Sequence, residues 1–189
     1  MKHLARIISR IFEPLVILPI ILVFAGVRAG LTEGSLLSFL TIMAALFIVP
    51  VIVFRVWLVA RFHLDWDISN RKKRIGPLIV LLLFLFGALI LVNQWHNVLL
   101  TDMFVQFFLW LVGFLVITLF WKISGHTGVI TLAFLLLLEW YGWQMWPILL
   151  AISLVTWARV VGKNHTLGQA IGGIVYSSLL HEIWKSILR

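Results

Sequence analysis

The sequence predicts an all-α protein, a polytopic integral membrane helical bundle with about six to seven transmembrane helices. Of its 189 residues, 62% are hydrophobic and 12% are charged, whereas an ordinary soluble domain carries about 25% charged residues. Its uncharged runs are also long enough to cross a hydrocarbon core of about 30 Å. Because backbone amides in lipid must be hydrogen-bonded within their own segment, each run is expected to be helical. A typical soluble globular protein and a disordered chain are both excluded.

Seven apolar segments follow one another along the chain, and each is expected to form one helix. Pro14 and Pro77 are expected to open helices, whereas Pro19 and Pro50 lie inside segments and predict kinks. The connections are short, so we expect one membrane-embedded domain over residues 1–189, without a separate soluble module. The segments are residues 14–30, 36–60, 77–93, 101–121, 128–142, 145–160 and 167–184.

The basic residues predict the orientation of this bundle. Seven crossings place four connecting or terminal stretches on one face, and that basic face holds eleven of the 15 Lys and Arg residues. The positive-inside rule puts this face in the cytoplasm, and the cell membrane is the expected location. Cations clustered beside membrane helices more often contact lipid head groups than nucleic acid, so no nucleic-acid partner is expected. The eleven are Lys2, Arg6, Arg10, Arg61, Arg71, Lys72, Lys73, Arg74, Lys122, Arg159 and Lys163.

Three short polar stretches lie on the basic face, at residues 65–74, 122–126 and 159–169. They are separated by even numbers of crossings, so they can meet at one site. Together they bring several cations and two histidines, which would make a strong anion site. The chain has no cysteine, which excludes disulfides and thiolate metal sites.

The second stretch contains Ser124, Gly125 and His126 at the expected start of a helix. Ser124 can cap this helix, and Gly125 lets a ligand approach the backbone. Free amides at a helix start attract phosphate. Taken alone, these residues are more often an ordinary serine N-cap on a membrane helix.

The third stretch combines Arg159 and His165, which are six residues apart, with a break at Gly162. Only a turn between two helices would aim both side chains inward. Gln169 follows His165 by four residues on the last helix, so its amide can accept the ring N–H and hold the imidazole. Each residue alone is more simply explained as a snorkelling arginine or an interfacial histidine.

In combination, these motifs resemble a known family. Ser124-Gly125-His126 followed by Arg159 and His165 looks like the second and third signature motifs of the phosphatidic acid phosphatase type 2 superfamily. The basic run 71–74 before Pro77 is loosely similar to that family's first motif. The resemblance spans most of the chain. It implies a metal-independent phosphatase that hydrolyses a lipid phosphate or an isoprenoid or polyprenyl diphosphate through a phosphohistidine, with no cofactor.

The resemblance also implies a role for each matching residue. His165 corresponds to the nucleophile, and His126 to the general acid that protonates the leaving oxygen. Gln169 stands where the family usually has an aspartate, so it could orient the ring but brings no charge. The positions expected to bind phosphate are Arg159, Arg74, Ser124 and Gly125, with Arg71 or Lys72 in place of the first-motif lysine.

The residue chemistry is consistent with this assignment, and two other functions stay open. Phosphoryl transfer needs cations on the equatorial oxygens and an in-line nucleophile opposite a protonated leaving group. One alternative is a non-catalytic member that binds phosphate lipids as a scaffold, sensor or translocator, which Gln169 suggests. The other is a metal-dependent prenyl or phosphatidyl transferase, because Asp65 and Asp67 could bind Mg²⁺ beside a diphosphate.

Overall fold

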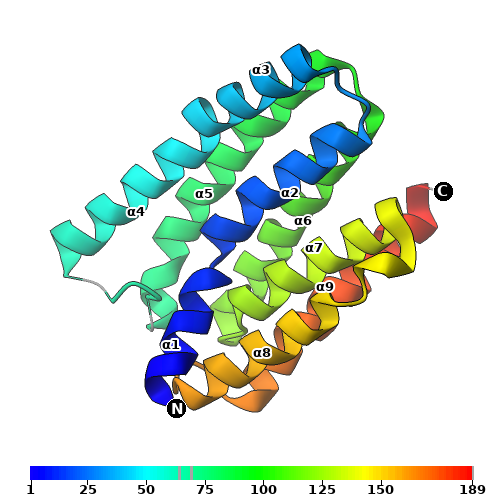
Figure 1. The fold of residues 1–189 in the computed structure, drawn as a ribbon. Helices are drawn as coiled ribbons and strands as arrows, with labels where there is room; N and C mark the ends of the chain where they lie inside the picture. Colours follow the sequence, from blue (N-terminus) through cyan, green and yellow to red (C-terminus); the bar gives the residue numbers. More distant parts are fainter. Residues whose placement is uncertain (64, 69, 189) are drawn as a thin grey trace. The chain divides into compact units, whose positions relative to one another are not determined.

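A computed structural model describes residues 1–63, 65–68 and 70–188, and all regular structure in this part of the chain is helical (Figure 1). Each of the seven apolar segments lies largely within helix, so the predicted all-α class is confirmed. The elements are α1 (Lys2–Ile11), α2 (Pro14–Arg28), α3 (Glu33–Met43), η1 (Ala44–Ile48), α4 (Val49–Phe62), α5 (Arg71–Val92), η2 (Asn93–Trp95), α6 (Val98–Phe120), α7 (Gly125–Tyr141), η3 (Gly142–Met145), α8 (Ile148–Val161) and α9 (Leu167–Leu188).

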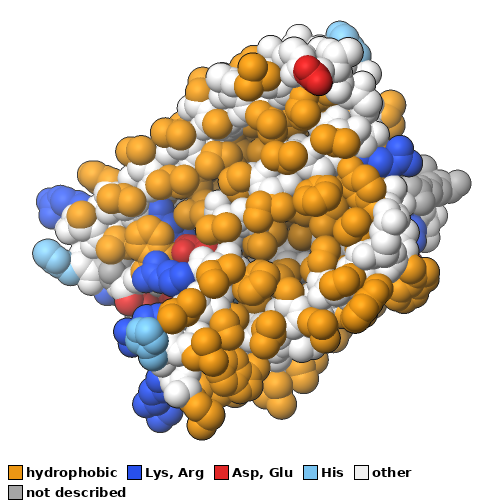
Figure 2. Space-filling view, viewed as in Figure 1, with side chains coloured by type: hydrophobic (Ala, Val, Ile, Leu, Met, Phe, Trp, Pro, Cys, Tyr) orange, Lys and Arg blue, Asp and Glu red, His pale blue; other side chains and the backbone are white. Residues whose placement is uncertain are grey.

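Five helical stretches in the described residues are long and apolar enough to cross a membrane: Lys2–Arg28, Glu33–Phe62, Arg71–Trp95, Val98–Phe120 and Gly125–Met145. α8 is apolar but has only 14 residues. Large hydrophobic side chains such as Leu37 (68% exposed) and Leu83 (65%) lie on the surface, and Figure 2 shows hydrophobic side chains over much of the visible face. These helices are compatible with a membrane protein, and the number of crossings stays a prediction.

The helices group into two compact units. One contains Met1–Leu18 and Lys122–Arg189, and the other contains Pro19–Trp121. The candidate histidines lie in the first unit, and the basic run 71–74 lies in the second. The expectation of one domain over the whole chain stays a prediction.

In the unit formed by Pro19–Trp121, two connections meet at one end. The Asn97 side-chain amide donates to the Ala29 carbonyl at 3.1 Å. The Phe39 and Trp95 rings pack edge to face with centroids 5.5 Å apart. The α2–α3 and α5–α6 connections are thereby held together, while the α4–α5 connection lies at the opposite end of α5. Successive connections in this unit therefore lie at opposite ends of α5, as expected if each helical stretch crosses the membrane once.

The start of α5 differs from the prediction. α5 begins at Arg71, because the Asn70 side chain caps it by accepting the Lys72 backbone N–H at 3.0 Å. The expectation that Pro77 opens this helix is wrong, since Pro77 lies inside α5. Its missing N–H removes one hydrogen bond without ending the helix. Pro14 does begin α2 as predicted.

Pro50 is the second residue of α4, which directly follows the π-helical turn η1. A π turn is a short insertion within an α-helix and does not end it. α3, η1 and α4 follow one another without a break, so Glu33–Phe62 is one helical stretch.

In the other unit, α7 supplies the core. Ile130 and Phe134 of α7 pack against Ile152 and Val155 of α8. α1 lies against α8, and α9 lies against α7. Eleven of the 17 residues of α7 are buried, so its first residues are held by neighbours on several sides. This is the part of the fold that carries the candidate site.

Candidate functional site

The start of α7 has the serine cap that the sequence predicts. The Ser124 hydroxyl accepts the Thr127 backbone N–H at 3.4 Å, and Gly125 is the first residue of the helix. Ser124 is fully buried, whereas Gly125 is partly exposed. The serine hydroxyl therefore holds the helix start from inside, and the backbone at Gly125 is the part that a ligand can reach.

The starts of α7 and α9 are joined by hydrogen bonds. The Ser124 N–H donates to the Gln169 carbonyl at 3.0 Å. The Thr127 hydroxyl donates to the Ala170 carbonyl at 2.8 Å. Residue numbers rise together along this contact, so the two helices run parallel and begin at the same end. The second and third polar stretches thus lie side by side, as the number of crossings between them predicts.

A close approach between the two helices continues one turn further along. A Cβ added at Gly173 would lie 2.5 Å from the Ser124 carbonyl oxygen and 2.5 Å from the Thr127 hydroxyl. The Ser177 hydroxyl donates to the Gly128 carbonyl at 2.9 Å. Small residues allow helices to approach this closely. The polar motifs do not predict this contact; its signal in the sequence is the series of small residues Ala170, Gly173 and Ser177.

The α8–α9 turn is also tied to the start of α7. The Lys122 ammonium donates to the Asn164 carbonyl at 2.9 Å. The backbone N–H groups of Asn164 and His165 both donate to the Arg159 carbonyl, at 3.1 and 3.2 Å. Arg159 and His165 are therefore carried on one tight turn, which is attached to the segment before Ser124.

α8 ends at Val161 with Gly162 as its C-cap, so the predicted break at Gly162 is confirmed, although the left-handed residue of the turn is the next one. Lys163 takes the left-handed conformation with φ 59°, and Gly162 stays in the ordinary helical region with φ −68°. A Cβ at Gly162 would lie 2.9 Å from the Ala158 carbonyl oxygen. Gly162 is thus needed for a close approach to the last turn of α8.

Three candidate catalytic or binding side chains are buried in this unit. Arg159 is 1% exposed, His165 6% and His126 9%. Arg159 is among the largest fully buried side chains of the described residues. A guanidinium held at low dielectric attracts an anion more strongly than one in water. The end of α8, the α8–α9 turn and the start of α7 thus each carry one buried candidate side chain, Arg159, His165 and His126.

Gln169 has a different partner from the one expected. Its carboxamide oxygen accepts the Thr166 backbone N–H at 3.1 Å, and the Thr166 hydroxyl accepts the Gln169 N–H at 3.2 Å. This reciprocal pair is a capping box at the start of α9. The sequence predicts that the Gln169 carboxamide oxygen accepts the His165 ring N–H. In the structure this oxygen instead accepts a backbone N–H at the start of α9.

Replacing Gln169 by alanine is expected to lower the free energy of unfolding by about 1 kcal/mol, because the Thr166 N–H loses its partner. Gln169→Glu keeps an acceptor at the same position and is expected to stay near the wild-type value. Denaturant unfolding of both variants in detergent, followed by circular dichroism, measures the difference. Equal stability of the two variants would contradict a capping role.

The basic run at the start of α5 organises its own loop. The Arg74 guanidinium donates to the Ile68 carbonyl at 2.6 Å and to the Asp67 carbonyl at 3.2 Å, and Arg74 is 9% exposed. Arg55 donates to the Trp66 carbonyl and lies over the Trp66 ring. Two buried or half-buried arginines therefore bind the backbone of this connection.

The other candidates of the first polar stretch lie in the same unit as Arg74. Arg71 is half-buried and Lys72 is exposed, while Ser69 lies outside the described residues. A phosphate-binding role for Arg71, Lys72 and Arg74 stays a prediction. Among the described residues, no group of three or more His, Asp or Glu side chains is placed to hold a metal ion, and a metal role for Asp65 and Asp67 also stays a prediction.

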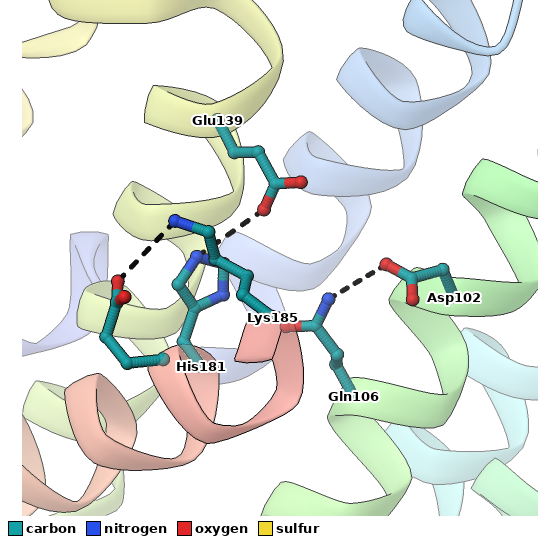
Figure 3. A network of polar contacts seen from close by, with 6 residues as sticks. Asp102, Gln106, Glu139, His181 and Lys185 are labelled. Carbon is teal, nitrogen blue, oxygen red and sulfur yellow. Dashed lines mark hydrogen bonds and ion pairs between the residues drawn. The ribbon is translucent and has the colours of Figure 1, made fainter. Parts of the chain in front are cut away.

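A second polar pair lies at the far end of α7 and α9 from the site (Figure 3). His181 Nε2 and a Glu139 carboxylate oxygen are 3.5 Å apart, and His181 is 2% exposed. This pair joins the ends of the two helices, just as Ser124 and Gln169 join their starts. Figure 3 also draws the Gln106 side chain, which donates to Asp102 at 2.9 Å within α6.

Comparisons of this chain with models of known protein families, with curated proteins and with solved structures give no match. The family resemblance of the motifs therefore stays a prediction from the residues. The second and third polar stretches are brought together by the hydrogen bonds at the starts of α7 and α9.

Proposed function

We propose that this protein is an integral membrane phosphatase that hydrolyses a lipid phosphate or an isoprenoid or polyprenyl diphosphate through a phosphohistidine. The observation that carries the proposal is the joined start of α7 and α9. There, Ser124 hydrogen-bonds to Gln169 at 3.0 Å, and Lys122 ties the turn of Arg159 and His165 to the same place at 2.9 Å. These are the two motifs on which the family resemblance is strongest.

Phosphate binding at this place has a simple electrostatic basis. Parallel helices present the positive ends of their dipoles on the same side, and backbone amides at a helix start bind phosphate oxygens. The partly exposed Gly125 would supply such an amide. The buried Arg159 would neutralise charge on the equatorial oxygens of the transferring group.

The proposed reaction has two steps. In the first, a ring nitrogen of His165 attacks phosphorus, the bond from phosphorus to the lipid oxygen breaks, and His126 gives its proton to that oxygen. In the second, His126 takes a proton from water, the water oxygen attacks the phosphohistidine, and His165 leaves with its electron pair restored. Splitting the displacement in this way is the ordinary advantage of covalent catalysis.

The apolar helices favour a lipid substrate over a soluble one. Five helical stretches of the described residues could cross a membrane, and the short connections leave little to recognise besides a phosphate and an apolar chain. We therefore assign the phosphate group to the polar end of α7 and α9, and the hydrocarbon part to the apolar surface of the helices.

The experiment measures phosphate release by detergent-purified protein from phosphatidic acid, phosphatidylglycerol phosphate, farnesyl diphosphate and the soluble p-nitrophenyl phosphate, with EDTA present. We expect release from one or more lipids in EDTA and little from the soluble ester. Release only after Mg²⁺ is added would favour the metal-dependent transferase. No release in either condition, with phosphatidic acid still bound, would favour the non-catalytic lipid-binding alternative.

The proposed membrane orientation gives a further prediction, which uses the absence of cysteine. Gly34→Cys and Lys72→Cys would each place the single thiol at an exposed position, and the two positions are separated by one crossing. If the basic face is cytoplasmic, a membrane-impermeant maleimide should label Gly34→Cys in intact cells and Lys72→Cys only after permeabilisation. The reverse pattern would invert the orientation, and equal labelling of both would contradict a crossing between them. The wild-type chain is the unlabelled control.

A further inference from the structure

An open apolar groove runs between α8 and α9, which lie side by side (Figure 1). Its volume is ≈ 490 Å³, and its walls are mostly aliphatic. The residues that matter here are Ile152, Thr156 and Val160 of α8 and Leu167, Ile171 and Ile174 of α9.

The groove exists because α9 has two different faces. Its small residues pack against α7, where Gly173 leaves no room for a side chain. Leu167 (55% exposed) and Ile171 (45% exposed) lie on the surface of α9, whereas Ile174 packs against the core formed by α7 and α8. Besides its close contact with α7, α9 therefore has exposed apolar residues beside α8.

One end of the groove lies beside the turn that carries Arg159 and His165, although neither of these residues lines it. On α8, Val160 directly follows the buried Arg159, and on α9, Leu167 is two residues after His165. From Ile152 to Val160, the α8 wall rises about 12 Å at 1.5 Å per residue. One half of a hydrocarbon core of about 30 Å is similar in depth. The groove thus begins at the polar turn and extends through roughly one leaflet.

We propose that this groove holds one hydrocarbon chain of the lipid substrate, while the phosphate of the same molecule lies at the turn of Arg159 and His165. This inference deepens the proposed function and depends on it. A chain leaving lipid for an apolar groove gains little from the hydrophobic effect, because lipid tails are already apolar. The groove instead fixes the depth and direction of the head group. It would thereby orient the phosphorus atom toward the attacking nitrogen of His165.

Two tryptophan variants of α9 test the inference. Ile171→Trp would fill the groove, whereas the matched control Val175→Trp changes a residue of similar exposure, 49% against 45%, that does not line it. The rates compare dipalmitoyl with dibutanoyl phosphatidic acid, whose chains differ in reach. We expect Ile171→Trp to lower kcat/KM about tenfold or more for the long-chain lipid and less than about twofold for the short-chain one. Val175→Trp should change neither.

An equal loss for both lipids, or an equal effect of the two variants, would overturn the inference and leave the proposed function standing. A readout without turnover separates the two proposals. Phosphatidic acid with a diazirine in its chain should cross-link to α8 and α9 in the wild type and much less in Ile171→Trp. Cross-linking elsewhere, unchanged by Ile171→Trp, would overturn the groove even if phosphate is released. Groove cross-linking without release in any condition would overturn the phosphatase and retain only a lipid-chain site.

Discussion

Replacing His165 by alanine is expected to lower phosphate release from the preferred lipid by about 10³-fold or more, because the variant loses the nucleophile and with it the covalent route. Initial rates in detergent with EDTA measure the effect. His165 is 6% exposed, so circular dichroism of the purified variant should accompany the rates and show the wild-type helix content.

A matched histidine control is available in α1. His3 is exposed, and His3→Ala is expected to keep the wild-type rate within about twofold. A lipid with radiolabelled phosphate, quenched during turnover, should leave label on the wild-type protein and on His3→Ala. Label retained on His165→Ala, or turnover close to the wild type, would contradict the assignment of the nucleophile.

Gly173→Ala is expected to give the largest loss of stability among single methyl additions in α9. The added Cβ would lie 2.5 Å from the Ser124 carbonyl oxygen and 3.2 Å from the Gly128 nitrogen. Both neighbours are backbone atoms, so the helices must move apart, and overpacking of this kind costs about 1–3 kcal/mol. Denaturant unfolding in detergent measures the change in the free energy of unfolding.

Gly87→Ala in α5 is the control for Gly173→Ala. No atom lies within 4 Å of a Cβ added at Gly87, so alanine there should stabilise the helix by about 0.5–1 kcal/mol. Equal effects of the two substitutions would contradict the close contact between α7 and α9. Phosphate release should also fall in Gly173→Ala, since separating the two helix starts moves His126 relative to His165.

The sequence predicts the helices and one contact between distant segments for a clear physical reason. Uncharged runs of this length have to be helical in lipid, and an even number of crossings returns the chain to the same side. These two rules place Ser124 and Gln169 at one end, and the structure joins them at 3.0 Å. The Ser124 cap follows from local chemistry alone.

Other features depend on competition between local rules. Thr166 and Gln169 have the spacing of a capping box, but Gln169 is also four residues from His165. The spacing alone does not decide whether the Gln169 carboxamide oxygen accepts the Thr166 backbone N–H or the His165 ring N–H. At the start of α5, the Asn70 cap determines where the helix begins, although Pro77 is the stronger signal in the sequence. The parallel packing of α7 and α9 depends on Gly173, whose importance is evident only when its neighbour is known.

The shortness of α8 has a consequence for the lipids around it. Its 14 residues rise about 21 Å, which is less than a hydrocarbon core of about 30 Å. In a bilayer, this hydrophobic mismatch would be relieved by local thinning beside α8 or by snorkelling of its flanking residues. The turn of Arg159 and His165, at the end of α8, would then lie below the average level of the head groups. For the proposed phosphatase, we therefore expect the rate of phosphate release to depend on the acyl-chain length of the surrounding bilayer lipids.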